Sequence, residues 1–158
     1  NQNPSWYRGM ERLGYNYIMT EFQAALGLQQ LHRLNDLIIE RKQRAALYNA
    51  IFKHHENIKI PQERPNVQHT HHLYIIEVPN RDKIYNYLKK RNIGSQVHYT
   101  PIHIQPFYRK KFQFKKGDFP VSEKYYERAL SLPLHTSLTH EELEFVAGEV
   151  LKSVGNEE

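Results

Sequence analysis

The chain has 158 residues, the size of one ordinary domain, and its 39% apolar and 12% aromatic content suffices for a packed core, which argues against disorder. No apolar run exceeds a few residues and no leader pattern stands at the front, so we expect neither a transmembrane helix nor a signal peptide; the lack of cysteine excludes disulfides, thiolate zinc sites and a cysteine nucleophile. The 22 basic and 17 acidic residues give a net charge of +5 with both signs interleaved, which favours a solvated surface, then a small anionic ligand, and only third nucleic acid.

Residues 1–19 are predicted to form an irregular segment, because Pro4, Gly9 and Gly14 interrupt a stretch rich in aromatic residues. The chain opens at Asn1 without an initiator methionine. It was processed, or it is a piece of a longer protein, or the record lacks its start, and the sequence leaves these three explanations open.

Residues 20–56 are predicted to form one long helix. Thr20 and Gln23 have the spacing of a capping box, in which each residue hydrogen-bonds the backbone of the other. Apolar residues then recur at steps of three, four and seven along one face: Leu31, Leu34, Ile38, Ala45, Tyr48 and Phe52. We interpret this stripe as core packing, and expect so long a helix to pack against something large.

Residues 57–158 are predicted to form a small α/β domain. A strand is expected over 72–78, a helix over 80–91 with Asn80 as its cap, and a second strand over 95–99. Ile84, Tyr87 and Leu88 are predicted to form the inner face of this helix.

A loop that contains Pro101 and Pro106 is expected next. Pro120 then opens a helix that runs to about Leu130. A second capping box at 139–142 begins the terminal helix. The predicted fold class is therefore α/β (α+β), a small sheet covered by helices and joined to one long helix, and this architecture by itself names no function.

Histidines suggest one possible metal site. His69, His71 and His72 are close in sequence, and residues 69 and 71 would share a face in a strand. No aspartate or glutamate stands close by in the sequence to complete a coordination shell. Hydrogen-bonded histidines are the preferred interpretation, and we predict no metal.

No self-contained catalytic centre is predicted either. The chain has no Gly-x-Ser-x-Gly elbow and no glycine-rich phosphate loop. Two loops still carry polar side chains at places suited to ligands. Residues 13–19 precede a helix N-terminus, where a phosphate can bind, and residues 96–106 leave the end of a predicted strand. For both, an ordinary structural turn is the alternative interpretation.

Several motifs in this order resemble those of the DegT-type sugar aminotransferases, which are pyridoxal-phosphate (PLP) enzymes with the aspartate-aminotransferase fold. The resemblance begins with Gly14-Tyr15-Asn16-Tyr17, then Met19-Thr20-Glu21 and Gln23-Ala24-Ala25-Leu26-Gly27. It continues through His72-Leu73-Tyr74 and through Val97-His98-Tyr99, Pro101, His103 and Gln105-Pro106. It ends in Phe119-Pro120 and Leu130-Ser131-Leu132-Pro133-Leu134.

Within the family, Gln96-Val97-His98-Tyr99 and the segment 115–120 most resemble the subgroup of pseudaminic acid biosynthesis. The resemblance implies amino transfer from glutamate to C4 of a UDP-linked 4-keto-6-deoxy-N-acetylhexosamine. It covers only the C-terminal part of such an enzyme, with residues 20–56 as the linking and dimer helix. The large domain, with its Schiff-base lysine, is absent from this chain, so no catalytic residue is assigned here and the chain alone is predicted to be inactive.

The resemblance also implies roles for individual residues. Asn16 would bind cofactor and substrate in the neighbouring subunit of a homodimer with shared active sites. Gln96, Val97, His98 and Tyr99 would line the nucleotide-sugar pocket. One position departs from the family, because Ile18 stands where an arginine usually helps to neutralise phosphate, and isoleucine neither carries charge nor donates a hydrogen bond.

Other functions remain as alternatives. One is amino transfer to another 3- or 4-keto nucleotide sugar, and another is a non-catalytic dimerisation or binding module that kept this half of the fold. A cytoplasmic location is expected, with no nucleic-acid partner and no membrane partner.

Overall fold

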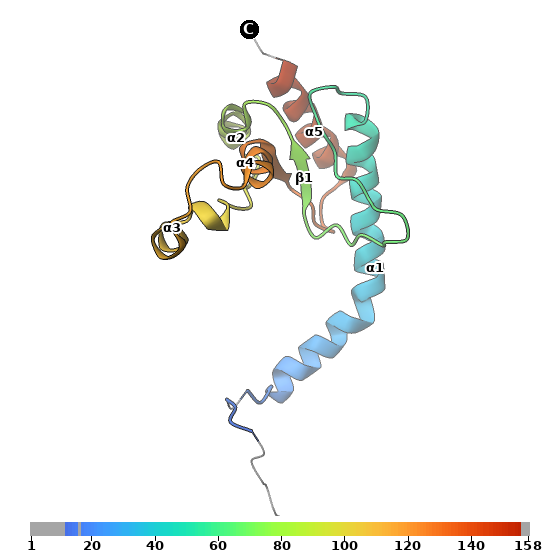
Figure 1. The fold of residues 1–158 in the computed structure, drawn as a ribbon. Coiled ribbons are helices and arrows are strands. Elements are labelled where there is room, and N and C mark those ends of the chain that lie inside the picture. Colours follow the sequence, from blue (N-terminus) through green and yellow to red (C-terminus); the bar gives the residue numbers. More distant parts are fainter. Residues whose placement is uncertain (1–11, 16, 156–158) are drawn as a thin grey trace, which may run out of the picture. The chain divides into compact units, whose positions relative to one another are not determined.

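The structure, a computed structural model, describes residues 12–15 and 17–155. It contains two compact units, Asn1–Leu34 and Asn35–Glu158. The boundary between them falls inside α1 (Glu21–Phe52), the long helix drawn in blue to green in Figure 1. None of the helices among the described residues is both long enough and apolar enough to cross a bilayer.

The first unit holds the beginning of α1. The predicted capping box is present, because the Gln23 amide donates to Thr20 Oγ1 at 3.3 Å and the Thr20 amide donates to Gln23 Oε1 at 3.0 Å. Apolar side chains of this unit are largely exposed, among them Phe22 at 80% and Leu31 at 64%. The first unit therefore presents apolar surface instead of burying it.

The apolar stripe of α1 was predicted to be core packing, and this prediction is wrong for its first half. Leu31 and Leu34 are exposed, whereas Ala45, Tyr48 and Phe52 are fully buried. The reason is that, within the described part of the chain, the buried core is built from residues between Ala45 and Val154, so apolar spacing alone does not distinguish a core stripe from a surface stripe.

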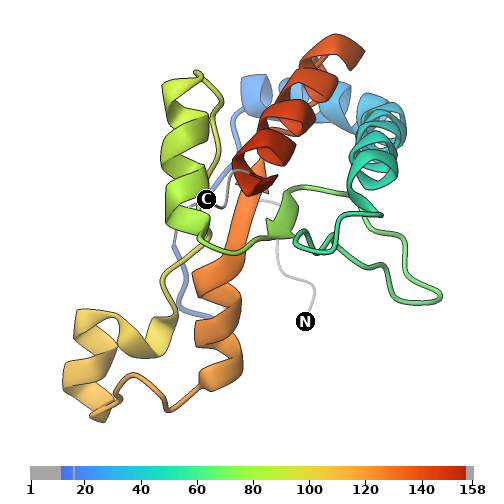
Figure 2. The same ribbon diagram turned by 90° about the horizontal axis from the view of Figure 1, so that it is seen from above.

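The second unit contains the rest of the fold. Its remaining elements are β1 (Tyr74–Glu77), α2 (Arg81–Lys90), the 3₁₀ turn η1 (Ile102–Ile104), α3 (Pro106–Phe112), α4 (Pro120–Arg128), β2 (Ala129–Leu132) and α5 (His140–Gly155). Helix α2 packs against α5 and β2, and α4 packs against β1. Figure 2 shows α2 and α5 together, with α3 and α4 joined by a loop at the other end. The predicted α/β class, a small sheet covered by helices, is confirmed.

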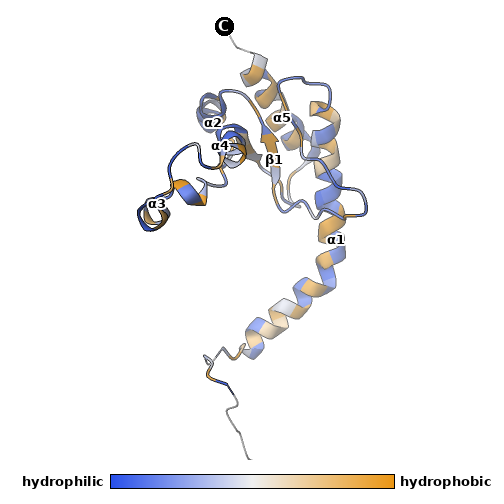
Figure 3. Cartoon of the chain, in the orientation of Figure 1, coloured by the Kyte–Doolittle hydropathy of each residue, from blue (hydrophilic) through white to orange (hydrophobic). Residues whose placement is uncertain are grey.

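The sheet has two strands and one short pairing on each outer edge. β1 and β2 are antiparallel, with Ile75 opposite Ser131 and Ile76 opposite Leu130. Lys59 bridges to Glu77 on the outer edge of β1, and Gln96 bridges to Ser131 on the outer edge of β2. In Figure 3, β1 is coloured apolar while the long segment before it is mostly polar, and alternate residues of β1, Tyr74 and Ile76, are buried.

Three predicted elements differ from the structure. Residues 95–99 form a single bridge at Gln96 instead of a strand. The helix expected to run to about Leu130 ends at Arg128, and Ala129–Leu132 form β2, because these residues pair with β1 and with Gln96. The predicted loop after Pro101 contains η1 and α3, with Pro106 at the first turn of α3, where its missing N–H costs nothing.

The predicted cap of α2 also differs in detail. Asn80 occupies the N-cap position, but in a left-handed conformation with φ 46°, and its side chain makes no capping hydrogen bond. Asparagine tolerates this conformation better than most residues, so the position suits it for a backbone reason. Ile84 and Leu88 are buried as predicted, and Tyr87 is half-buried.

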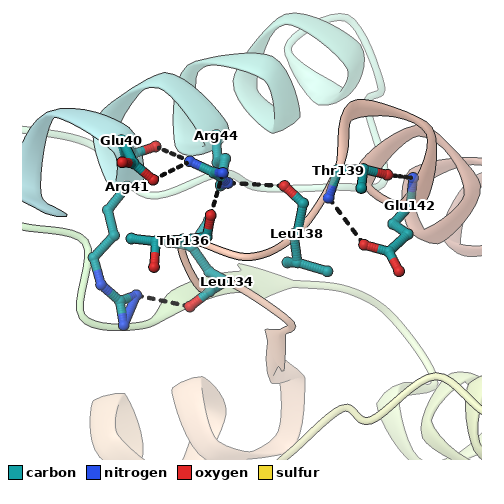
Figure 4. A network of polar contacts seen from close by, with 8 residues as sticks. All are labelled: Glu40, Arg41, Arg44, Leu134, Thr136, Leu138, Thr139 and Glu142. Atoms are coloured by element: carbon teal, nitrogen blue, oxygen red, sulfur yellow. Dashed lines mark hydrogen bonds and ion pairs between the residues drawn. The ribbon is translucent and has the colours of Figure 1, made fainter.

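Two arginines tie α1 to the segment before α5 (Figure 4). Arg41 donates to the Leu134 carbonyl at 2.7 Å. Arg44 donates to the carbonyls of Leu138, at 3.0 Å, and of Thr136. Charge-assisted bonds to otherwise free loop carbonyls are strong, so this network fixes the loop that leads into α5.

Candidate functional site

The segment Gln96–Tyr99 lies beside β2 and is held there by backbone hydrogen bonds. The Gln96 amide donates to the Ser131 carbonyl at 3.0 Å, and the Ser131 amide donates back at 2.8 Å. Val97 packs against the core, while its main chain makes no hydrogen bond within the described part of the chain. All four predicted pocket residues, Gln96, Val97, His98 and Tyr99, are at least partly exposed next to this anchored point.

His98 is oriented by the strand beside it. Its Nδ1 lies 2.8 Å from Ser131 Oγ, and the ring stacks edge-on against Tyr99 with the centroids 4.7 Å apart. The peptide bond between His98 and Tyr99 is cis. Because Nδ1 is engaged by Ser131, Nε2 is the ring nitrogen left to contact a ligand.

Tyr99 opens onto a cavity of about 530 Å³. This is within the size range of small-molecule sites. The cavity is walled by Tyr99, Thr100, Pro101, Ile102, His103, Phe114, Phe119 and Ser122. Tyr99 is 76% exposed, so its hydroxyl is accessible at the rim. An apolar cavity with a tyrosine and a histidine beside its rim can bind an organic ligand that carries polar groups.

The sequence did not predict the roles of several residues that shape this site. In the sequence, Ser131 stood out only as part of a family motif, yet its backbone anchors Gln96 and its hydroxyl contacts His98. Phe114, Phe119 and His103 wall the cavity, and His103 pairs with Glu123. His98 and Ser131 are 33 positions apart and His103 and Glu123 are 20 apart, so local spacing carried no signal of their proximity.

The other predicted binding loop belongs to the first unit. Asn16, the predicted cofactor-binding residue, lies outside the described residues. Its neighbours Tyr15 and Tyr17 stack with ring centroids 5.4 Å apart. Ile18 is 84% exposed, so it has the accessibility of a contact residue, although its side chain is apolar.

The surroundings of the histidine cluster differ from what the sequence predicted. The premise that no carboxylate lies near was wrong, because Glu63 Oε1 is 2.8 Å from His71 Nε2. Glu63, His69 and His71 form one cluster of possible ligands. His69 Nδ1 accepts a hydrogen bond from the His71 amide at 2.9 Å.

The contacts of His71 explain its place without a metal. Burial lowers the pKa of the His71 imidazole, which favours its neutral form. Its Nδ1 is buried without a hydrogen-bond partner among the described residues. If a metal were bound at Nε2, a hydrogen-bond acceptor would be needed at Nδ1 to orient the ring. The expectation of no metal stays a prediction.

Comparison with known proteins adds independent information. The DegT/DnrJ/EryC1/StrS aminotransferase family matches residues 2–151. An uncharacterized protein of Methanocaldococcus jannaschii is 40% identical over 156 residues, covering 95% of this chain and 40% of the relative. The UDP-4-amino-4,6-dideoxy-N-acetyl-beta-L-altrosamine transaminase of Helicobacter pylori is 31% identical over 149 residues, covering 91% of this chain and 39% of that enzyme.

The fold has solved counterparts as well. Helicobacter pylori PseC, an aminotransferase involved in the biosynthesis of pseudoaminic acid, superposes with a TM-score of 0.86 at 29% identity, covering 98% of this chain and 42% of that one. This chain thus spans about 40% of the length of the proteins it matches. The predicted resemblance and the predicted fold, the small C-terminal part of an aminotransferase, are confirmed.

Proposed function

Because this chain belongs to the DegT/DnrJ/EryC1/StrS aminotransferase family, we propose that it is the C-terminal part of a PLP-dependent enzyme. The proposed reaction moves an amino group from glutamate to C4 of a UDP-linked 4-keto-6-deoxy-N-acetylhexosamine. In this enzyme the chain supplies one side of the nucleotide-sugar pocket. Its similarity to the altrosamine transaminase and to PseC supports this substrate class.

One observation carries the proposal at the level of residues. Tyr99 stands at the rim of the cavity, and His98 packs against its ring and is held to the sheet by Ser131. A nucleotide sugar is rich in hydroxyl and diphosphate oxygens. The His98 imidazole, the Tyr99 hydroxyl and the free Val97 amide are donors suited to those oxygens. Rigid anchoring makes such contacts selective because little ordering is needed on binding.

The cofactor does not fit the residues of this chain alone. None of the lysines of the chain is buried, and none lines the cavity beside Tyr99. A lysine that forms a Schiff base normally lies in a protected site where its amine can lose its proton. We therefore derive no step of the cofactor chemistry from this chain, and we propose that a large domain outside it supplies that lysine.

We further propose a homodimer with shared active sites, in which Asn16 reaches the cofactor and substrate of the neighbouring subunit. The exposed apolar residues of the first unit, such as Phe22, Leu26 and Leu31, support an interface there. The predicted cytoplasmic location stays a prediction.

The test of the sugar pocket is the variant His98→Ala in the intact enzyme. The Michaelis constant for the nucleotide sugar should rise about tenfold, the equivalent of ~1.4 kcal/mol, because a contact to the sugar nucleotide is lost. The half-reaction with glutamate should change little. His54→Ala, at an exposed histidine outside the site, is the matched control. Equal losses in both half-reactions would show that His98 does not serve the sugar.

The test of the reaction itself uses the native gene product. Borohydride reduction followed by intact-mass measurement should give a mass well above that of this chain, with a phosphopyridoxyl group attached. Turnover of a panel of UDP-, GDP- and dTDP-linked 3- and 4-keto sugars then separates the proposed substrate from the alternatives. An unmodified product of this chain's mass would favour the non-catalytic binding module.

A further inference from the structure

Next to the cavity lies a buried, hydrogen-bonded histidine–glutamate pair that the proposed function does not use. His103, in η1, and Glu123, in α4, are each 7% exposed, and His103 Nε2 is 2.8 Å from Glu123 Oε1. Burying a carboxylate is unfavourable unless it is paired and hydrogen-bonded. The buried carboxylate of Glu123 therefore indicates a structural role that an apolar side chain could not fill.

Glu123 also binds the backbone of the loop before α4. The Gly117 amide donates to both carboxylate oxygens, at 2.8 and 3.0 Å, and the Phe119 amide lies 3.5 Å from Oε1. Gly117 has φ +98°, a conformation that side-chain-bearing residues rarely adopt. The hydrogen bonds from His103, Gly117 and Phe119 lower the pKa of the Glu123 carboxyl. One carboxylate thus joins the loop 113–119 to η1.

The same loop forms part of the wall of the cavity. The ring of Phe119 lies 4.7 Å from that of His103 and 5.5 Å from that of Phe114, measured between centroids. All three rings line the cavity that opens at Tyr99. Glu123 does not line the cavity, so its influence there passes through His103 and the loop.

We infer that Glu123 is a positioning residue for the nucleotide-sugar cavity. It holds the Phe114–Phe119 wall in place through the Gly117 and Phe119 amides, and it orients His103 through the hydrogen bond to Nε2. This inference rests on the proposed function for the identity of the ligand. The clamp, by which we mean the hydrogen bonds of Glu123 to His103, Gly117 and Phe119, rests only on the contacts of Glu123.

The test is Glu123→Gln, with two readouts. In this chain, deuterium exchange at the Gly117 and Phe119 amides should become faster, since an amide group cannot accept as many hydrogen bonds as a carboxylate while facing His103. In the intact enzyme, the Michaelis constant for the sugar should rise about tenfold with the glutamate half-reaction unchanged.

Glu127→Gln is the matched control. It lies one turn further along α4 and pairs with Lys116 of the same loop at 3.3 Å, but both side chains are more than half exposed. Exposed pairs contribute little, so neither readout should change. Gly117→Ala is a second variant in case Glu123→Gln fails to fold. Its Cβ meets no atom within 4 Å, yet the backbone is strained, so it should loosen the loop and raise the same Michaelis constant.

The outcomes separate the two levels of the inference. Faster exchange with an unchanged Michaelis constant in an active enzyme overturns the positioning role and leaves the proposed function intact. Unchanged exchange overturns the clamp. A wild-type enzyme that aminates no nucleotide sugar overturns the proposed function and, with it, the positioning role, whatever the exchange measurement gives.

Discussion

Glu149 is the most completely buried carboxylate among the described residues, and three partners surround it. Its side chain is 2% exposed. Tyr87 donates to Oε2 at 2.8 Å, Lys152 donates to Oε1 at 2.7 Å, and Arg91 lies 3.3 Å from Oε2. The hydrogen bonds from Lys152 and Tyr87 hold the pKa of this carboxyl below its usual range. The bond between Tyr87 and Glu149 also raises the pKa of the Tyr87 hydroxyl. Glu149 therefore joins α2 to α5 in its ionised form.

This lowered pKa predicts a loss of stability in acid. The stabilising effect is complete above the pKa of an unfolded glutamate, about 4.3, and is lost as the pH falls through the lower folded-state value. We expect Glu149→Gln to be less stable than the wild type at pH 7 and to lose less stability than the wild type on acidification. Urea unfolding between pH 7 and pH 3 measures both effects.

Glu144→Gln, at an exposed position of the same helix, is the control for this experiment. Its acid profile should follow that of the wild type. Glu149→Gln should still lose some stability in acid, because the pKa values of Glu123 and Glu141 are lowered too. A Glu149→Gln profile parallel to the wild type would contradict the assignment.

Two helices of the chain begin with the same capping motif in different surroundings. At α5, the Glu142 amide donates to Thr139 Oγ1 at 3.2 Å and the Thr139 amide donates to Glu142 Oε2 at 2.9 Å. At α1, Thr20 and Gln23 make the equivalent bonds. α5 is buried along one face, whereas the first turns of α1 carry no buried residue.

Thr139→Ala should therefore destabilise the fold by about 1 kcal/mol, the typical cost of a lost N-cap. Thr20→Ala should leave the unfolding transition almost unchanged, since the turns it caps contribute no core residue, and should only reduce the helical circular dichroism signal. Chemical denaturation of both variants measures the difference. Equal destabilisation would mean that the start of α1 unfolds together with the core.

The sequence predicted those elements whose signals are local. The two capping boxes, the apolar run of β1 and Pro120 at the start of α4 each lie within a few residues, and the structure contains all of them. β2 was missed because Ala129-Leu130-Ser131-Leu132 continues a helical pattern equally well. Only its partners, Ile75 on one side and Gln96 on the other, make it a strand.

The candidate site was predictable only in part for the same reason. The segment 96–99 stood out through its motif and its polar residues at the end of a predicted strand. The serine that anchors it and the glutamate that pairs with His103 come from distant parts of the chain. Pairing of this kind depends on the tertiary fold, which no spacing rule within one sequence reveals.

At the scale of the whole molecule, the division into two units predicts that the second unit folds without the first. Among the described residues, every buried core residue lies between Ala45 and Val154. A chain of residues 35–158 should unfold cooperatively with a free energy within about 0.5 kcal/mol of the full chain, because the described residues that are removed contribute nothing to this core. Urea denaturation of both chains measures this, and loss of cooperativity in the shorter chain would refute it.

The arrangement of the sheet also has a consequence for the order in which the protein takes shape during synthesis. β1 leaves the ribosome before β2, and residues 78–128 separate the two strands. Gln96 and His98 both rely on Ser131 in β2. The nascent chain can therefore form α1 and α2 from local contacts, but the segment 96–99 has no anchor until Ser131 has emerged and β2 has docked. A chain that stops before this point has every residue of the segment 96–99 and lacks the strand that holds it.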